Sequence, residues 1–381
     1  MDVYLDNAAT SHPKPEAVYS AVNDVLRGGG SANRAGHDRG MGATRRLFEV
    51  REALADFLGA PDSSRVVFTA NGTDALNLAL KGYLRSGDHV VTTDVEHNAV
   101  VRPLHALATR AGVRVTRVAA ERDGRIDPPA ILQALEPDTR LVVCTHASNV
   151  LGAVVDIASL GHALRKRGVP LLVDAAQTLG YINVDVVDMG IAMLAAPGHK
   201  GLLGPQGTGL LYVREDIALA TWREGGTGTE SSRAEMPEAM PERLEAGTHN
   251  LPGIAGLGAA VAWLRARGVD RIHTKKRAHV TRLIDALGAD ARLRIVSATE
   301  ATQQSSLVSF TVDGVDSQRI AGALGQRGIA VRGGLHCAPG AHAAADTGRW
   351  GAVRVSPGVF TEEDDISVFL HTLGEVLDTC R

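Results

Sequence analysis

The chain has 381 residues, 44% of them hydrophobic and 22% charged, with a formal net charge of -3. This length predicts two or three packed domains, and so small a charge excludes a global basic field that would attract nucleic acid. The 14 histidines form no metal-ligand repeat, the three cysteines form no Cys-x-x-Cys pair, and no apolar run is long enough to cross a bilayer. We therefore expect neither a metal site nor a membrane span. The odd cysteine count and the acidic opening segment, residues 1–6, predict a cytoplasmic protein without a signal peptide.

Apolar runs typical of strands alternate with helix-like segments between about residues 15 and 213. The predicted strands are 65–69, 89–93, 113–118, 140–145, 170–174, 191–195 and 209–213. Segments with a 3.6-residue apolar period lie between most of them, for example 72–84, 99–111 and 160–167. Continuous Val- and Leu-rich strands separated by helices predict an α/β fold with a mostly parallel, seven-stranded sheet covered on both faces.

The pattern changes after residue 225. Glycines and polar residues over 225–241 predict a long exposed loop, and the amphipathic stretches 252–266 and 271–287 predict two helices. Two strands (306–312, 352–356) and two helices (317–326, 362–377) then predict a smaller α+β domain. We assign residues 15–250 to a large domain, and residues 1–14 with 251–381 to a small one.

Asp174 and Lys200 indicate a cofactor. Asp174 closes a predicted strand, and Lys200 follows it in a Gly-rich segment. A lysine can hold an aldehyde as an imine, and a carboxylate can keep a pyridine nitrogen protonated so that the ring accepts electrons. Together they are the minimal signature of a pyridoxal phosphate (PLP) site. Taken alone, Asp174 is more often a helix cap and Lys200 a solvated surface lysine.

Polar side chains also follow other predicted strands. Gly72 and Thr73 open a helix whose N–H groups can cradle a phosphate, and a flat His97 ring can stack on a pyridine. Asn149 follows the strand 140–145, and Gln177 comes three residues after the aspartate, in reach of a ring hydroxyl. Each residue alone reads as a cap or a turn. Because ligands gather at the carboxyl ends of parallel strands, the set together predicts one cofactor cleft.

Cys337 suggests the use of the cofactor. It lies beside His336, among glycines and five residues after Arg332. A flexible, cationic loop favours an accessible thiolate, although a lone cysteine is most often a small buried hydrophobe. Arg354 stands in a predicted strand between two valines. A buried arginine needs a partner, which is either a substrate carboxylate or an internal ion pair.

These blocks together resemble the class V aminotransferase family, specifically the cysteine desulfurases and selenocysteine lyases, over nearly the whole chain. The motifs that carry the resemblance are Tyr4-Leu5-Asp6-Asn7-Ala8-Ala9-Thr10, Glu96-His97-Asn98, Ser148-Asn149-Val150-Leu151-Gly152, Asp174-Ala175-Ala176-Gln177, Gly198-His199-Lys200 and Arg332…His336-Cys337-Ala338. The resemblance implies the fold type I of PLP-dependent transferases and a homodimer with active sites at the interface. The short spacing from Cys337 to Arg354 resembles the group II type, which has a short cysteine loop.

The resemblance also implies a role for each site residue. Lys200 is the Schiff-base lysine, and Cys337 is the nucleophile. The PLP ring is contacted by His97, Asn149, Asp174 and Gln177. The phosphate is held by Gly72, Thr73, His199 and, from the partner subunit, Thr248. The substrate carboxylate is held by Arg354, with Asn149 and Arg332.

The activity implied by this resemblance is conversion of L-cysteine to L-alanine, with the sulfur passed to Cys337 as a persulfide and then to an acceptor protein or small thiol. The alternatives are a selenocysteine lyase, or another PLP-dependent C–S lyase or aminotransferase acting on a small amino acid. A sulfur-relay or regulatory scaffold that binds a partner through residues 231–241 is a further alternative. The acceptor, the cysteine or selenocysteine preference, and the pathway (iron–sulfur cluster biogenesis among them) stay open.

Overall fold

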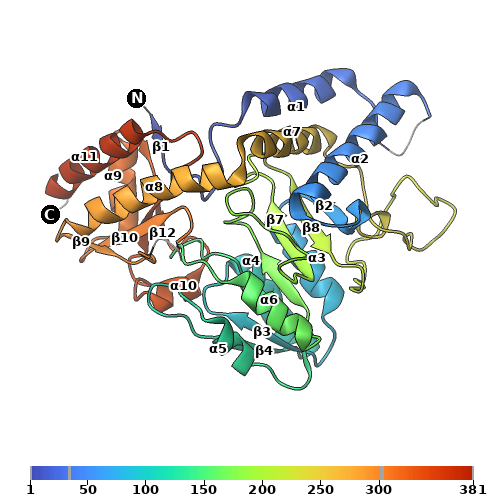
Figure 1. Ribbon diagram of the computed structural model, residues 1–381, viewed down its shortest axis with the longest axis horizontal. Helices are drawn as coiled ribbons and strands as arrows, with labels where there is room; N and C mark the ends of the chain where they lie inside the picture. Colours follow the sequence, from blue (N-terminus) through green and yellow to red (C-terminus); the bar gives the residue numbers. More distant parts are fainter. Residues whose placement is uncertain (1, 33–35, 301–303, 380–381) are drawn as a thin grey trace.

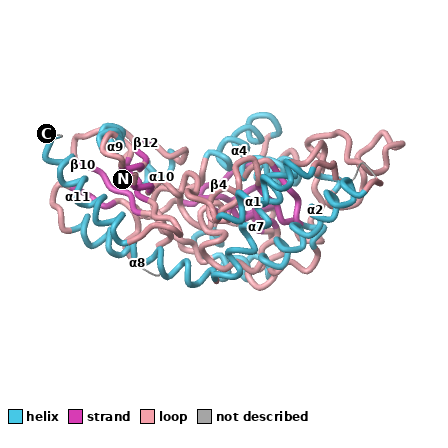
Figure 2. Tube along the Cα trace, turned by 90° about the horizontal axis from the view of Figure 1, so that it is seen from above, coloured by secondary structure: helices cyan, strands magenta, loops and turns pink. Residues whose placement is uncertain are grey.

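The computed structural model describes residues 2–32, 36–300 and 304–379. Figure 1 shows an elongated molecule, with a larger part around a wide sheet and a smaller part that contains both chain ends. Helix α8 (Val269–Gly288) runs from one part to the other, and the view from above in Figure 2 shows the same division.

The larger part is built on a seven-stranded sheet. Its strands, in spatial order, are β2 (Val66–Thr69), β8 (Gly209–Val213), β7 (Met193–Pro197), β6 (Leu171–Asp174), β5 (Thr139–Thr145), β3 (His89–Thr93) and β4 (Arg114–Val118). All neighbouring strands are parallel except the pairs that β8 forms with β2 and β7. The predicted mostly parallel sheet is therefore confirmed.

Helices cover both faces of this sheet, as predicted from the apolar strands. Alternate side chains of one strand enter opposite cores: Val66 and Phe68 pack on one face, and Val67 packs on the other. Helices α3 (Gly72–Tyr83) and α4 (Asn98–Ala111) contribute to the core with Val67. The core on the other face is formed with α1 (Glu16–Gly28), α2 (Asp38–Leu58), α5 (Pro128–Gln133), α6 (Ile157–Lys166) and α7 (Leu251–Arg267).

The smaller part contains an antiparallel sheet with the strand order β12 (Arg332–Gly334), β13 (Ala352–Val355), β10 (Val308–Val312) and β9 (Leu293–Ile295). Its core is closed by α8, α9 (Ser317–Gly325) and α11 (Glu363–Thr379). Strand β1 (Val3–Tyr4) pairs with β11 (Ile329–Ala330), which attaches the N-terminal arm to this part. The short helix α10 (Pro339–Ala344) follows Cys337. The domain boundaries after residues 14 and 250 stay a prediction.

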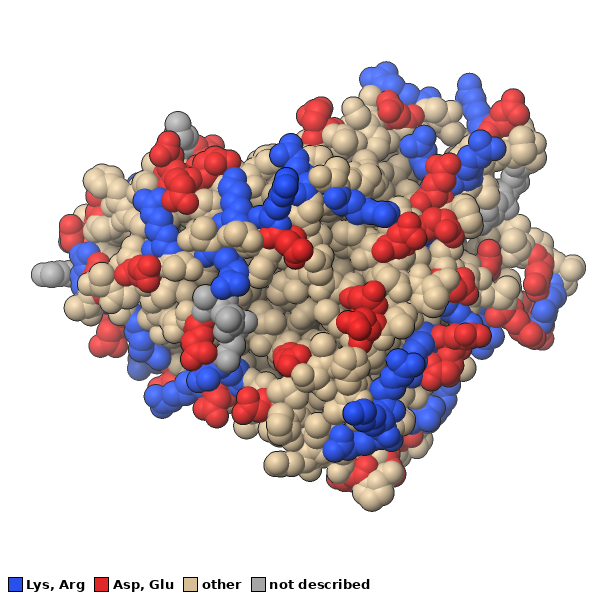
Figure 3. Space-filling view, viewed as in Figure 1, with Lys and Arg blue, Asp and Glu red and all other residues tan. Residues whose placement is uncertain are grey.

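Residues 225–241 contain no helix or strand, in agreement with the predicted loop. The 3-10 helices η1 (Ser63–Arg65) and η2 (Glu242–Leu244) each add one short turn. Figure 3 shows acidic and basic side chains interspersed over one face of the molecule, so no field of a single sign covers that face. None of the helices in the described part of the chain is long and apolar enough to cross a membrane.

Candidate active site

The polar residues from the strand ends meet in one cavity. Every residue predicted to contact the cofactor lines it, apart from Thr248: Gly72, Thr73, His97, Asn149, Asp174, Gln177, His199 and Lys200. The parallel strands β2, β3, β5 and β6 all end at this edge of the sheet, which explains the convergence. Thr248 lines a separate hollow on this chain.

One end of the cavity is suited to an anion. Helix α3 begins here, and its cap Asn71 accepts a hydrogen bond from the Asp74 N–H at 2.9 Å, so the positive end of the helix dipole faces the cavity. His199 lies nearby with its Nδ1 atom buried and without a hydrogen-bond partner among the described residues. Burial and the charge of Lys200 lower the pKa of His199 to about 4. A phosphate would satisfy this orphaned nitrogen.

Lys200 and Asp174 both line the cavity; Asp174 is buried and Lys200 is half-buried. Burial lowers the pKa of Lys200 to about 8, an effect that Asp174 opposes and that the charges of Arg354 and Arg332 reinforce. Burial raises the pKa of Asp174, whereas the Ala176 N–H, which donates to Asp174 Oδ1 at 2.9 Å, and Lys200 act in the opposite direction. The pair therefore combines an amine whose pKa is lowered to about 8 with a carboxylate held in a buried site.

His97 presents a neutral ring to the cavity. Its Nδ1 accepts a hydrogen bond from the Ala99 N–H at 3.0 Å, so in the neutral ring the proton is on Nε2. Burial, with a contribution from the charge of Lys200, lowers the pKa of His97 to about 4. The neighbouring Glu96 anchors this loop to β5, because its Oε1 accepts from the Thr145 N–H at 2.8 Å. Burial raises the pKa of Glu96 to about 8.

Gln177 is tied to the N-terminal arm. Its Nε2 donates one hydrogen to the Ala8 carbonyl at 3.1 Å, so the amide oxygen and the second amide hydrogen are the groups that can meet a ligand. The predicted contact of this side chain with a ring hydroxyl stays a prediction.

Cys337 is exposed and does not line the cavity, but its loop is attached to Asn149 of the cavity wall and to Asn98, which lies between the wall residues His97 and Ala99. The Cys337 carbonyl accepts from the Asn98 N–H at 2.7 Å, and the His336 carbonyl accepts from Asn149 Nδ2 at 2.7 Å. The loop also packs closely: a Cβ on Gly340 would come 2.0 Å from the Asp94 carbonyl oxygen. The side-chain N–H of Asn149 is thus used to hold the cysteine loop.

The backbone of the cysteine loop is strained. His336 and Cys337 have φ angles of 49° and 57°, in the left-handed region that residues with a Cβ avoid. Such a residue costs about 1–3 kcal/mol and persists only where its surroundings fix it. Two successive left-handed residues at a candidate nucleophile indicate that the conformation of this loop is functional.

Arg354 is fully buried and forms an internal ion pair, which is one of the two alternatives that the sequence predicts for its partner. Its Nη2 donates to Asp6 Oδ1 at 2.8 Å, and its Nη1 donates to the Asn149 carbonyl at 2.9 Å. Nε is buried and, within the described residues, without a partner. Arg332 is half-buried, and its charge lowers the pKa of both His97 and Lys200. Both arginines are therefore electrostatically coupled to the cavity.

The family model described as Aminotransferase class-V matches residues 3–369. The chain belongs to this family. It is 36% identical over 387 residues to a probable cysteine desulfurase of Methanothermobacter thermautotrophicus, which covers 98% of this chain and 94% of the relative. This class V aminotransferase also resembles the apo structure of a cysteine desulfurase from Thermococcus onnurineus NA1, with a TM-score of 0.92, 30% identity and coverage of 99% and 95%.

A second similar structure is the cysteine desulfurase CsdA (S-sulfonic acid) from Escherichia coli, with a TM-score of 0.88 and 28% identity over 100% of this chain and 96% of that one. These likenesses confirm the predicted fold. The family implies PLP as cofactor, and the residues present fit it: a half-buried lysine and a buried aspartate, a neutral flat imidazole, and an orphaned His199 nitrogen in the cavity at which α3 begins.

Three residues at the site make contacts that the sequence does not predict. Asp6 and Asn98 lie within motifs of the family resemblance, yet their partners Arg354 and Cys337 are far away in the chain, so no local pattern reveals the contacts. His342 lies in α10 and contacts His336. Only its position five residues after the cysteine hints at a connection.

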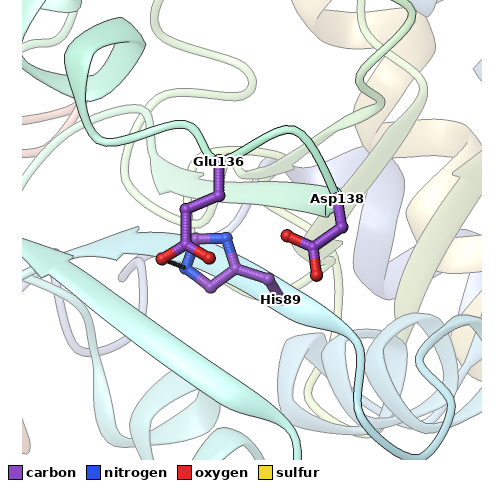
Figure 4. A group of neighbouring side chains, drawn as sticks. All are labelled: His89, Glu136 and Asp138. Atoms are coloured by element: carbon purple, nitrogen blue, oxygen red, sulfur yellow. Dashed lines mark ion pairs between the residues drawn. The ribbon is translucent and has the colours of Figure 1, made fainter.

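One group of residues in the described ranges has the composition of a metal site: His89, Glu136 and Asp138 (Figure 4). Its ligand atoms are already engaged. Both His89 nitrogens contact threonine hydroxyls at 2.9 Å, and Arg114 pairs with both carboxylates. We therefore assign no metal to this group.

Proposed function

We propose that this class V aminotransferase is a PLP-dependent cysteine desulfurase that converts L-cysteine to L-alanine and takes up the sulfur on Cys337. The observation that carries the proposal is the strained cysteine loop, which is hydrogen-bonded to Asn149, a wall residue of the cavity that Lys200 also lines, and to Asn98, which adjoins the wall residue His97. The names of the similar proteins support the same activity.

PLP would supply an electron sink for the substrate α-carbon. Lys200 would bind its aldehyde carbon, Asp174 would face the pyridine nitrogen, and His97 would lie against the ring. Gln177 would meet the ring hydroxyl. Its phosphate would be held by Gly72, Thr73, His199 and, from the partner subunit, Thr248.

The chain's own residues account for substrate binding and proton transfer. The buried Nε atom of Arg354, which has no partner among the described residues, leaves a donor for the substrate carboxylate, with Asn149 and Arg332 beside it. Because the pKa of Lys200 is about 8, roughly a tenth of its amine is neutral near pH 7, far more than for an ordinary lysine, and can accept the substrate α-proton. Exposed Cys337 is able to meet the substrate sulfur at the cavity entrance.

Sulfur transfer balances without an added oxidant. The Cys337 sulfur forms a bond to the substrate sulfur, the substrate carbon–sulfur bond breaks, and its electron pair stays on the carbon, which takes up a proton. L-cysteine and the Cys337 thiol thus give L-alanine and a Cys337 persulfide. A thiol acceptor or an acceptor protein then removes the outer sulfur.

The test is an assay of alanine and sulfide with L-cysteine and a reductant. We expect equal amounts of both from the wild type, and from Cys144→Ala, a control that removes a buried thiol. Cys337→Ala should produce neither. Full activity of Cys337→Ala with L-cysteine would overturn the proposal, and activity retained only with selenocysteine would favour a selenocysteine lyase.

We also propose a homodimer. Large apolar side chains on α1 and α2 are exposed, among them Leu26 at 67% and Phe48 at 58%. Thr248 lines a hollow together with Leu26, so it lies at the edge of the same face, where a second subunit would be in reach. The cytoplasmic location and the identity of the sulfur acceptor stay predictions.

A further inference from the structure

Two buried histidines flank Cys337 in the sequence and contact each other. His336 precedes the cysteine, and His342 lies one turn into α10; their exposed fractions are 3% and 0%. The rings are nearly parallel, at 11°, and His336 Nδ1 lies 3.3 Å from His342 Nε2. Neither residue lines the cofactor cavity, so the pair is not explained by cofactor binding.

The hydrogen bonds of this pair fix the proton positions in both rings. His336 Nε2 lies 3.2 Å from the Arg332 carbonyl, which can only accept, so this nitrogen carries a hydrogen. In the neutral ring His336 Nδ1 then carries no hydrogen and accepts a hydrogen bond from His342 Nε2. His342 Nδ1 is in turn bare and accepts from the Thr347 hydroxyl at 2.7 Å. The result is one directed chain from Thr347 through both rings to Arg332.

Both rings are neutral at physiological pH. Burial, with the charge of Arg354, lowers the pKa of His336 to about 2; burial lowers the pKa of His342 to about 4, an effect that a hydrogen bond of this ring to the Leu335 backbone opposes. A neutral pair keeps the directed order of hydrogen bonds, whereas a protonated His336 would have no bare nitrogen to accept from His342.

This series of hydrogen bonds gives the strained loop a further attachment, besides those to Asn98 and Asn149. Asn98 and Asn149 bind the Cys337 and His336 carbonyls, and the His342 contact fixes the His336 ring. A left-handed residue with a Cβ relaxes unless its surroundings hold it. Losing either the asparagine hydrogen bonds or the His342 contact should therefore release the loop.

We propose that His342 is a positioning residue: by donating a hydrogen bond to His336, it holds the Cys337 loop in its left-handed conformation with the thiol at the cavity entrance. The inference rests on the proposed function of Cys337 as sulfur acceptor. It extends the working site to α10 and Thr347, which touch neither the substrate nor the cofactor.

The test compares two substitutions that each keep half of the imidazole. A glutamine amide reaches the position of Nε2 and keeps the donor to His336, whereas an asparagine amide reaches the position of Nδ1 and loses it. For His342→Asn we expect kcat to fall at least about tenfold with little change in the KM for L-cysteine, because the thiol is displaced and the substrate site is intact. His342→Gln should regain most of the lost kcat.

Hydrogen exchange of the purified proteins supplies a readout that does not depend on the reaction. The Asn98 amide is bonded to the Cys337 carbonyl, so in His342→Asn its exchange should be about tenfold faster, and in His342→Gln close to that of the wild type. Equal behaviour of the two variants, or unchanged Asn98 exchange in His342→Asn, would overturn the inference. If the exchange result holds while the wild type forms no persulfide, the proposed function fails and the positioning role stands.

Thr347 provides a second pair of variants in case the His342 substitutions do not fold. Thr347→Val removes the hydroxyl that orients His342, and Thr347→Ser keeps it. We expect faster Asn98 exchange in the valine variant only; the same rate in both variants would contradict the directed chain.

Discussion

The pKa of Lys200 is lowered by burial and by two arginines and raised by Asp174, and its net value can be tested by varying the pH. Its pKa is lowered from 10.5 to about 8, so the folded protein holds this amine neutral above about pH 8, where an ordinary lysine is still protonated. Only the neutral amine attacks an aldehyde. We predict that the rate at which cofactor-free protein captures PLP rises with pH and levels off above about pH 8.

Capture can be measured by borohydride reduction and quantification of the labelled Lys200 peptide. N-acetyl-lysine is the reference for the ionisation of PLP itself. If the capture rate keeps rising toward pH 10.5, as it does for the N-acetyl-lysine reference, then burial does not lower the pKa of Lys200.

Arg354 gives the second prediction at the residue scale. Its two Nη atoms bond separate partners, Asp6 and the Asn149 carbonyl, and a lysine ammonium cannot reproduce this fork while still facing a carboxylate. For Arg354→Lys we expect the KM for L-cysteine to rise at least about tenfold, with a smaller loss in kcat. Arg349→Lys, at an exposed position, is the control. An unchanged KM would remove Arg354 from substrate binding.

At the scale of elements, a buried ion pair connects α2 to the segment that contains Thr248. Arg51 donates to both Glu245 oxygens, at 2.7 and 2.9 Å, and the Phe68 N–H and His249 also contact this carboxylate. Removing one partner leaves a buried charge unpaired, so Arg51→Met should lower the free energy of unfolding by about 3–5 kcal/mol.

The double variant Arg51→Met with Glu245→Gln should lose less stability than the two single variants added together, because no unpaired charge remains. Denaturant unfolding monitored by circular dichroism measures all three. Losses that add without coupling would indicate that the pair does not act as a unit.

The strands differ in how well the sequence predicts them. Strands such as β5 and β6 are buried on both faces and bounded by turns, so their apolar runs locate them and the polar residues that follow. Strands β9, β11 and β12 have two or three residues, too few for a period. The ion pair of Asp6 with Arg354 joins residues from the two ends of the chain, and only the folded sheet brings them together.

The whole molecule leaves an apolar face exposed on α1 and α2, and this face carries the prediction of a homodimer. We expect a mass in solution of about twice 40.0 kDa by light scattering. Phe48→Glu places a charge on the face and should yield a monomer with weaker PLP retention, since Thr248 would lose its partner site.

Val368→Glu is the matched control, since Val368 is exposed on α11 in the other part of the molecule. A wild type that is monomeric, or a Phe48→Glu variant that stays dimeric, would contradict this interface.

Transfer of sulfur from L-cysteine to Cys337 can be followed by mass spectrometry of the Cys337 peptide after one turnover without reductant. We expect a mass increase of one sulfur atom on this peptide, absent from the peptide of the buried Cys144, and one alanine formed per sulfur bound. Alanine released with no added sulfur on Cys337 would contradict it and assign the reaction to direct elimination.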